Sequence, residues 1–440
     1  MKRILYFVFW VIFCTSCGNF LEEYSQDLVY AQSCEDLDEI LIGNGYMAQP
    51  TTPSYFSYGD KAFYYPYLHV MDDDIEEYLT GNANISSSIN PVTTLRNFYI
   101  WAKEPFMRIS GLTFRDYDWK RMYEHIGYLN VIISYVKEFH EDSEEMRHRI
   151  LGEAQFLRAG YYFMLVNLYA NPYSKETADA TMGVPLNLTE YIEEGYFSRD
   201  PVAAVYRQIV TDLENAIVNL SGIKQPTIYR VNEKAARALL SRVYLYMGEW
   251  QLVIDECDEI IKMGCSLWDL NNFDPGTATF GCKRDYFLAK ESPEIFFTQG
   301  AGVVGLLMDN QNITSQTRYR ASDELYGIYS KYEKDGILDL RKNCFFEMSK
   351  RDNGYFFVRK NPMFDATVFD SFLLRSGEIY LNKAEAQAML DQADAINTMK
   401  ELMNKRYADH KLPVIDGLSG KELIQFIREE RRKELCFEGH

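Results

Sequence analysis

Apolar residues recur at helical spacing over two long stretches that a short polar link joins. In the first stretch, Trp119 to Val136, apolar side chains fall at every third or fourth position. In the second, Ile150 to Leu168, the same spacing continues until Asn171-Pro172 ends it. The two stretches therefore predict a pair of antiparallel helices.

A second group of helices follows. Asp200-Pro201 is a strong helix-start pattern, and an apolar stripe runs from Val205 to Leu220. Asn232 is expected to begin another helix that Gly248 ends, and residues 250–261 continue the pattern. Small and aromatic residues around a helix pair interrupted by glycine are typical of a tetratricopeptide repeat.

A comparable pair is predicted over residues 374–390 and 391–407, and a last helix over 421–435. No strict 34-residue period runs through the chain, which argues against a regular solenoid. The predicted fold class is mainly α, with tetratricopeptide-like helical hairpins and large irregular insertions.

Two segments lack helical periodicity. Residues 45–115 are rich in Pro, Gly, Asn, Ser and Tyr and predict a loop, and so long a loop is usually functional. Residues 264–371 contain aromatic and Gly-rich stretches, with short strands expected at 294–297 and 354–358. We expect three regions: 33–263 as an N-terminal helical scaffold that contains the 45–115 loop, 264–371 as an irregular ligand-binding insertion, and 372–440 as a further hairpin and the start of a C-terminal region.

The first residues predict export. Lys2 and Arg3 precede an apolar run from Ile4 to Phe13, which is shorter than the roughly 20 residues that a spanning helix needs. Thr15-Ser16 directly before Cys17 resembles a bacterial lipobox, in which the cysteine becomes the lipid-modified first residue. We therefore expect a signal peptide over 1–16, lipidation at Cys17 and a tether over 17–32. The alternative is plain secretion with cleavage nearby.

Charge excludes one class of partner. The chain has 46 Lys and Arg against 64 Asp and Glu, a formal charge of −18. Removal of Lys2 and Arg3 with the signal peptide would give −20. A surface this acidic argues against nucleic-acid binding.

The common catalytic patterns are missing from the sequence. It contains no Gly-x-Ser-x-Gly, no His-Glu-x-x-His, no P-loop and no dinucleotide fingerprint. The acidic cluster Asp72-Asp73-Asp74 does not fit an EF-hand, because Glu77 stands where that loop needs glycine. It is a solvated loop or a weak cation site.

A glycosidase needs two facing carboxylates, but 64 acidic residues supply such pairs by chance. We expect no enzyme activity, cofactor or metal.

Aromatic residues make up 15% of the chain. Those in the predicted helices fall at core spacing, whereas those in the irregular segments do not. A sugar ring can pack its apolar C–H face on an aromatic plane while its hydroxyls bond polar side chains. The candidate ligand-binding residues are Asn97, Tyr99 and Trp101 in the first irregular segment, and Trp268 and Phe273 in the second. Alternatively, such aromatics pin their loops to the core.

Several longer patterns are spread over the chain. Cys17 is followed by Phe20-Leu21-Glu22, and a D-x-R pattern lies at Asp339 and Arg341. The other patterns are W-x3-Y-x2-I-x3-N from Trp119 to Asn130, E-A-x-F-L-R-A-x-Y-Y from Glu153 to Tyr162, R-x2-E-x-Y-L-x2-A-E-A from Arg375 to Ala386, and I-x2-E-R-x2-E-L-x2-E-G from Ile427 to Gly439. In this combination the chain resembles the SusD/RagB family of outer-membrane lipoproteins of Bacteroidetes.

The resemblance implies a binding protein on the outer face of the outer membrane, held there by its lipid. Such proteins cover a SusC-like TonB-dependent transporter and deliver glycans to it or, in some members, peptides. Helical hairpins contact the transporter, and irregular segments hold the ligand. Members usually continue beyond the Glu-Gly-His segment at which this chain stops, so we expect a truncated C-terminal part. Glycan capture is the leading interpretation; peptide capture and a scaffold lipoprotein without a small ligand are the alternatives.

Overall fold

The computed structural model describes residues 31–48, 63–79, 91–107, 111, 113, 115–191, 196–274, 286–308, 317–348, 355–356, 360 and 368–439. The predicted signal peptide, Cys17 and almost all of the tether lie outside the described residues.

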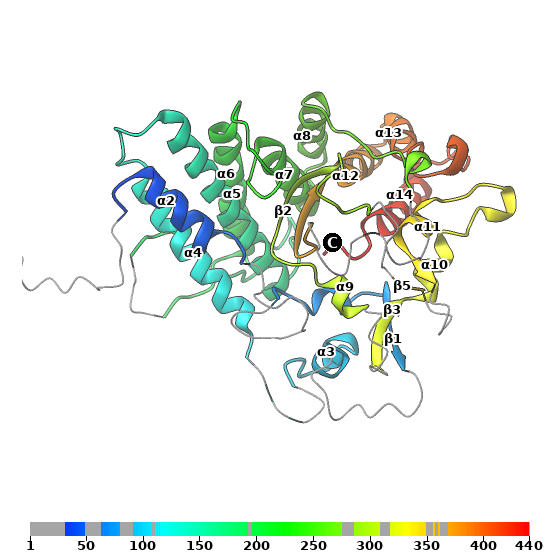
Figure 1. Cartoon of the computed structure of the whole chain (residues 1–440), viewed down its shortest axis with the longest axis horizontal. Coiled ribbons are helices and arrows are strands. Elements are labelled where there is room, and N and C mark those ends of the chain that lie inside the picture. The colour runs from blue at the N-terminus through cyan, green and yellow to red at the C-terminus, as the bar shows by residue number, and fades with distance from the viewer. Residues whose placement is uncertain are drawn as a thin grey trace, which may run out of the picture.

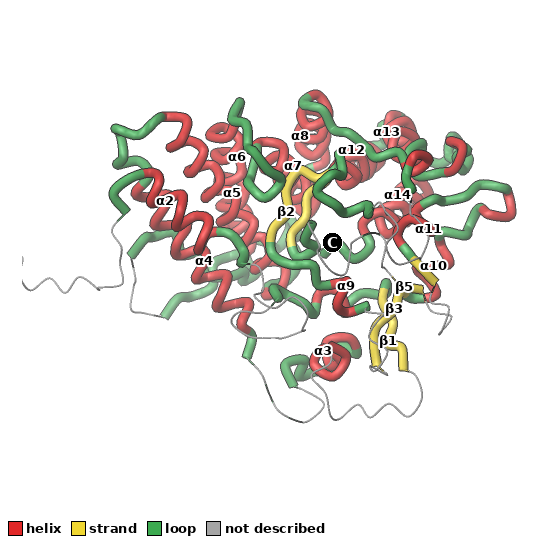
Figure 2. Tube along the Cα trace, in the orientation of Figure 1, coloured by secondary structure: helices red, strands yellow, loops and turns green. Residues whose placement is uncertain are grey.

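Helices dominate the described residues, as Figure 2 shows, and the predicted mainly α class is confirmed. The long helices are α4 (Tyr117–Tyr135), α5 (Glu144–Tyr169), α6 (Val202–Leu220), α7 (Glu233–Met247), α8 (Trp250–Lys262), α12 (Ser376–Met389), α13 (Asp394–Met403) and α14 (Gly420–Leu435). The shorter ones are α2 (Cys34–Ile40), α3 (Pro91–Tyr99), α9 (Val304–Leu307), α10 (Asp323–Ile328) and α11 (Arg341–Phe345).

The long helices form a row in which each one packs against the next. α4 to α8 follow one another as antiparallel neighbours, α12 packs on α7 and α8, and α13 and α14 pack on α12. Figure 1 shows α4, α5, α6 and α7 on the left and α12, α13 and α14 on the right. The structure therefore has two groups of helices, which meet where α12 contacts α7 and α8.

Local sequence patterns explain where these helices begin and end. The Asn232 side chain accepts a hydrogen bond from the Ala235 N–H at 3.0 Å, and Gly248 ends α7 in the left-handed conformation, both as predicted. The start of α6 differs from the prediction. Pro201 stands before its first residue, Val202, and the Asp200 carboxylate accepts from the Leu186 N–H at 2.8 Å instead of capping the helix.

Short strands join segments that are far apart in sequence. β1 (Ile75–Leu79) pairs with β3 (Thr317–Ala321), β2 (Ile295–Gln299) with β6 (Phe372–Arg375), and β4 (Glu347–Met348) with β5 (Tyr355–Phe356), all antiparallel. The strands predicted at 294–297 and 354–358 correspond to β2 and β5. The prediction of a loop over 45–115 is wrong in part, because α3 and β1 lie within it.

A network of buried charges lies between β6 and α14. It contains five cationic and five carboxylate side chains, and none is more than 5% exposed. Its members are Arg341, Lys360, Arg375, Arg406 and Lys433 with Glu294, Asp339, Glu430, Glu434 and Glu438. A buried charge is tolerated only when it is paired and hydrogen-bonded, and the network meets this condition with equal numbers of each sign.

Arg375 stands at the centre of this network. Its guanidinium donates to both oxygens of Glu438 at 2.8 Å, to Glu434 at 2.8 Å and to Glu294 at 3.0 Å. Arg406 approaches the same carboxylates from the other side, at 2.7 Å from Glu294 and 2.8 Å from Glu434. A Cβ atom at Gly377 would collide with the Arg375 guanidinium and lie 2.7 Å from the Glu434 carboxylate, so this position has to be glycine.

The longer sequence patterns are therefore largely structural. Six of the ten network members come from them: Asp339, Arg341, Arg375, Glu430, Glu434 and Glu438. The Glu153 to Tyr162 pattern serves the other group of helices, where Arg158 donates to both oxygens of Asp212 at 2.7 and 2.8 Å. Glu153 is fully buried and accepts from Arg149 at 3.0 Å.

Replacing Arg375 with methionine should destabilise the protein by about 3–5 kcal/mol, because Glu438, Glu434 and Glu294 would lose a shared buried partner. Urea denaturation measures this free energy of unfolding. Arg207→Met is the matched control, since Arg207 is exposed and lies 3.4 Å from an exposed Asp179. The control should cost less than about 1 kcal/mol. Equal losses in the two variants would contradict a structural role for the network.

The network also predicts acid sensitivity. Burial alone would raise the pKa of Glu430, but Lys433 and Arg341 lower it to about 2. Burial alone would also raise the pKa of Glu434, but Arg406 and Arg375 hold it well below its ordinary value. Glu430 and Glu434 bind protons more readily in the unfolded chain than in the folded protein. The stabilisation that their negative charges provide is therefore complete above about pH 4.5 and is lost as the pH falls toward 2. Thermal unfolding between pH 7 and 2.5 tests this, and Glu430→Gln should flatten the pH dependence. A midpoint that does not change below pH 4.5 would contradict the assignment.

Candidate functional site

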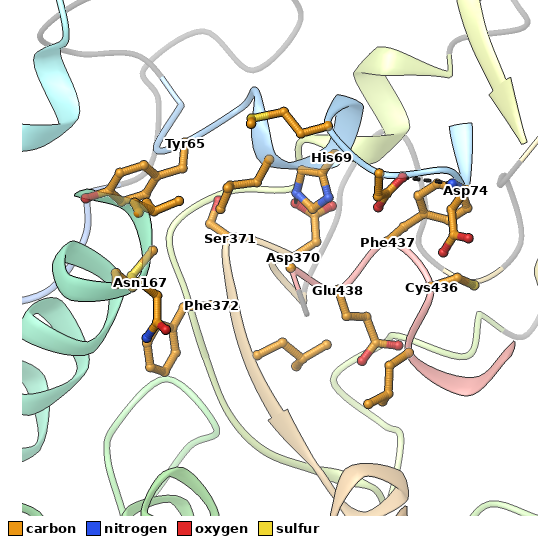
Figure 3. Close-up of a pocket in the computed structure, with 18 of the residues that line it drawn as sticks. Tyr65, His69, Asp74, Asn167, Asp370, Ser371, Phe372, Cys436, Phe437 and Glu438 are labelled. Atoms are coloured by element: carbon orange, nitrogen blue, oxygen red, sulfur yellow. Dashed lines mark hydrogen bonds and ion pairs between the residues drawn. The ribbon is translucent and has the colours of Figure 1, made fainter. Parts of the chain in front are cut away.

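A cavity of about 700 Å³ opens between the two groups of helices. Its wall comes from the turn at 64–74, Trp101, α5, α7, β6 with the residues before it, and α14 with the segment that follows. Figure 3 shows side chains from the turn, from the start of β6 and from the segment after α14 around one space. The volume is within the range of roughly 300–1,000 Å³ that is usual for ligand pockets.

Trp101 is the most exposed large apolar side chain of this cavity. It lies just after α3, and 70% of its surface is accessible. Its backbone N–H donates to the Phe98 carbonyl at 3.0 Å, which fixes the turn while the indole stays uncovered. An uncovered aromatic ring of this size beside a cavity is suited to contact a ligand.

Asn97 and Tyr99, two other predicted ligand residues, hold this turn in place. The Asn97 amide donates to the carbonyls of Glu104 and Met107. The Tyr99 hydroxyl accepts from the Glu77 N–H at 3.2 Å, and its ring lies 5.5 Å from that of Tyr319. Neither Asn97 nor Tyr99 lines the cavity, so the structure gives both residues contacts that support the position of Trp101.

Three aromatic residues of the cavity have a left-handed backbone. Tyr65, Trp101 and Phe437 have φ values of 46°, 50° and 63°. Bulky side chains rarely adopt this conformation, which costs about 1–3 kcal/mol and is typical of functional sites. The other described non-glycine residues with positive φ are Asp391, Asp409 and His410, none of which lines the cavity. Among the Phe, Tyr and Trp residues that the structure describes, positive φ values therefore occur only around this cavity.

His69 and Asp370 form a buried polar pair in the wall, facing one another in Figure 3. The His69 Nε2 atom lies 3.6 Å from Asp370 Oδ1, and the two Asp370 oxygens accept from the Val303 and Val304 N–H groups at 2.7 and 3.1 Å. Burial lowers the pKa of His69 to about 4, so the imidazole is neutral at pH 7. Two backbone N–H groups therefore hold the Asp370 carboxyl group in its position beside His69.

The acidic turn Asp72-Asp73-Asp74 lies along the same wall. Asp74 is buried and accepts from Arg432 Nε at 2.6 Å, whereas Asp72 and Asp73 are exposed. Enclosure of the carboxyl group and the nearby Asp74 raise the pKa of Asp72 to about 7. Within the described ranges, no three His, Cys, Asp or Glu side chains converge as a metal site would require.

The structure places Trp268 and Phe273 beside the buried charge network. Their ring centroids are 5.2 Å apart, and the backbone N–H of Trp268 donates to the Glu294 carboxylate at 2.8 Å. Phe273 is 7% exposed, and neither residue lines the cavity next to Trp101. These contacts agree with the alternative that aromatics of irregular segments pin them to the core, and ligand binding by the two residues stays a prediction.

Sequence reasoning missed the cavity residues that come from helices, such as Asn167 on α5, Tyr246 on α7 and Arg428 on α14. All three are exposed. Each lies within a helix whose spacing indicated a scaffold role, and only the packing of α5, α7 and α14 around one space brings them together.

Comparison with known proteins gives the family. Residues 71–245 match a family described as "Starch-binding associating with outer membrane", and residues 361–440 match the SusD family. The chain is 26% identical over 268 residues to "SusD-like protein P25" of Formosa agariphila. That alignment covers 60% of this chain and 46% of the relative, so the chain matches less than half of its length.

Solved structures share the fold. A SusD superfamily protein of Bacteroides thetaiotaomicron superposes with a TM-score of 0.70 at 21% identity, over 92% of this chain and 87% of its own. A SusD-like carbohydrate binding protein of Bacteroides vulgatus gives 0.65 at 18% identity, over 92% and 82%. The two family matches together cover more than half of the sequence. The chain therefore belongs to the SusD/RagB family.

Proposed function

We propose that the protein is a lipoprotein of the cell surface that captures an oligosaccharide or polysaccharide and delivers it to a SusC-like TonB-dependent transporter. The observation that carries the proposal is the cavity of about 700 Å³ with the exposed, strained Trp101 beside it. The starch-binding description of the matched family and the carbohydrate-binding relative support it.

The chemistry of the wall suits a sugar. The uncovered Trp101 indole offers an apolar plane to the C–H face of a pyranose ring. The exposed Asn167 amide and the Asp72 and Asp73 carboxylates can bond its hydroxyls. The cavity is open and mixes apolar with polar groups, as a ligand with alternating C–H and O–H surfaces requires.

The proposal assigns capture and delivery to different parts of the molecule. The cavity lies where the two groups of helices meet, and the outer sides of the helical row remain for a protein partner. Attachment to the outer membrane is assigned to a lipid on Cys17. Among the described residues, no helix is both long and apolar enough to cross a bilayer.

Trp101→Ala should weaken glycan binding about tenfold or more, because removal of a central aromatic contact usually costs over 1 kcal/mol. Calorimetric titration with the strongest binder from a glycan array measures the affinity. Tyr196→Ala is the control, since Tyr196 is fully exposed and does not line the cavity.

An unchanged glycan affinity in Trp101→Ala would show that Trp101 does not contribute to ligand binding. A protein that binds peptide mixtures but no glycan would overturn the glycan proposal in favour of peptide capture. A stable complex with a transporter, together with no small ligand, would favour the scaffold alternative.

Cys17→Ala should release the protein from the membrane, because the variant lacks the thiol that carries the lipid. Fractionation of cells after labelling with a fatty-acid analogue measures both retention and modification. Cys265→Ala is the matched control, because Cys265 lies far from the predicted signal peptide, and it should leave the label in place. Persistent labelling of Cys17→Ala would show that the lipid is attached elsewhere.

A further inference from the structure

A ladder of polar side chains links three helices along one wall of the cavity. Arg242 on α7 donates to both carboxylate oxygens of Glu378 on α12, at 2.6 and 2.7 Å. One turn further along α12, Asn382 donates to Ser241 on α7 at 3.2 Å and accepts from Arg431 on α14 at 2.9 Å. Arg242 and Arg431 both line the cavity.

The ladder ends on a carboxylate that two guanidinium groups share. Arg428 Nε donates to one Glu385 oxygen at 3.1 Å, and Arg431 Nε donates to the other at 3.1 Å. Glu385 is 9% exposed, whereas the Arg428 side chain is 56% exposed and lines the cavity. In the described part of the chain Arg428 donates its hydrogen bond through Nε, and its two terminal nitrogens make none.

The charges of this ladder do not cancel. Arg242, Arg428 and Arg431 supply three positive charges, and Glu378 and Glu385 supply two negative ones. Arg428 and Arg431 share the single Glu385 carboxylate, and Arg428 is the more exposed of the two, at 56% against 19%. One helical turn further on, Arg432 is already held by Asp74 and Glu324, both at 2.6 Å. The cavity therefore has an exposed guanidinium at Arg428 and an exposed carboxylate at Asp73.

An aromatic ring stands on the same side of the cavity. Tyr246 follows Arg242 by one turn of α7, lines the cavity and is 44% exposed. Its ring lies 5.1 Å from that of Phe163, an edge contact that fixes the ring and leaves part of it uncovered. The cavity therefore presents both the Tyr246 ring and the Arg428 guanidinium, whose terminal N–H groups can donate to a ligand.

We propose that the ligand of this cavity is an acidic glycan whose carboxylate or sulfate ester group binds Arg428, with a sugar ring against Tyr246. This inference rests on the proposed glycan-binding function and names the class of glycan. A guanidinium presents paired donors that match the geometry of such an oxyanion, and a charge-assisted bond of this kind is stronger than a neutral one. Asp73, on the other side of the cavity, carries a carboxylate that repels an anion, so the acidic group is directed to Arg428.

The test compares neutral, uronate-containing and sulfated oligosaccharides of matched length, by array screening and then calorimetry at low salt. The protein should bind at least one acidic class more tightly than its neutral counterpart. Arg428→Gln should weaken that binding about 10- to 100-fold and leave neutral oligosaccharides unaffected. Arg428→Lys should recover part of the loss, because lysine keeps the charge without the paired donors.

Lys421→Gln is the matched control, since Lys421 is exposed on the same helix and does not line the cavity. It should leave every affinity unchanged. The relative affinities of uronate and sulfated ligands identify which oxyanion is bound. Equal affinity for acidic and neutral ligands, or an equal loss for both in Arg428→Gln, would overturn the inference while the glycan-binding function stands. Binding of no glycan at all would overturn the proposed function as well.

Discussion

The buried charge network is the constraint on which the rest of the structure depends. Ten charged side chains are removed from water, and each is tolerated only because partners of opposite sign surround it. Such a network contributes little net stability compared with an apolar core, but the loss of any member leaves another charge unpaired. It therefore requires the segments around 294, 339, 375, 406 and 434 to take one arrangement. One product of that arrangement is a wall of the cavity, because Glu438 lines it and is held by Arg375 and Lys360.

The sequence predicted the helices well because their signals are local. Apolar spacing, the Asn232 cap and the Gly248 stop all act within a few residues. The pairing of residues 75–79 with 317–321 depends on contacts across more than two hundred residues, which no local pattern contains. Trp101 and Trp268 both looked like loop aromatics. Only packing distinguishes them, since Trp101 is 70% exposed and Trp268 packs against Phe273 and Phe287.

The cavity uses parts of the chain that differ in backbone conformation. α5, α7 and α14 supply polar groups from positions fixed by helix packing, whereas Tyr65, Trp101 and Phe437 lie in strained turns. The helices can therefore keep one arrangement while the residues around the opening of the cavity differ. The motif residues maintain that arrangement, and Trp101 and Arg428 lie outside the motif positions. Ligand preference could therefore change among members of this family without a change in the buried charges.

The position of the network along the chain also has a consequence for folding order. Arg406 and Glu294 are 112 residues apart in sequence, and Arg341 and Glu434 are 93 apart. Contacts of such long range form slowly, because large loops have to close before the contacts stabilise them. Three of the five carboxylates, Glu430, Glu434 and Glu438, lie in α14 or just beyond it. During synthesis the cations at 341, 375 and 406 are made after Glu294 and Asp339 but before these three carboxylates, so the docking of α14 completes the pairing of segments made earlier.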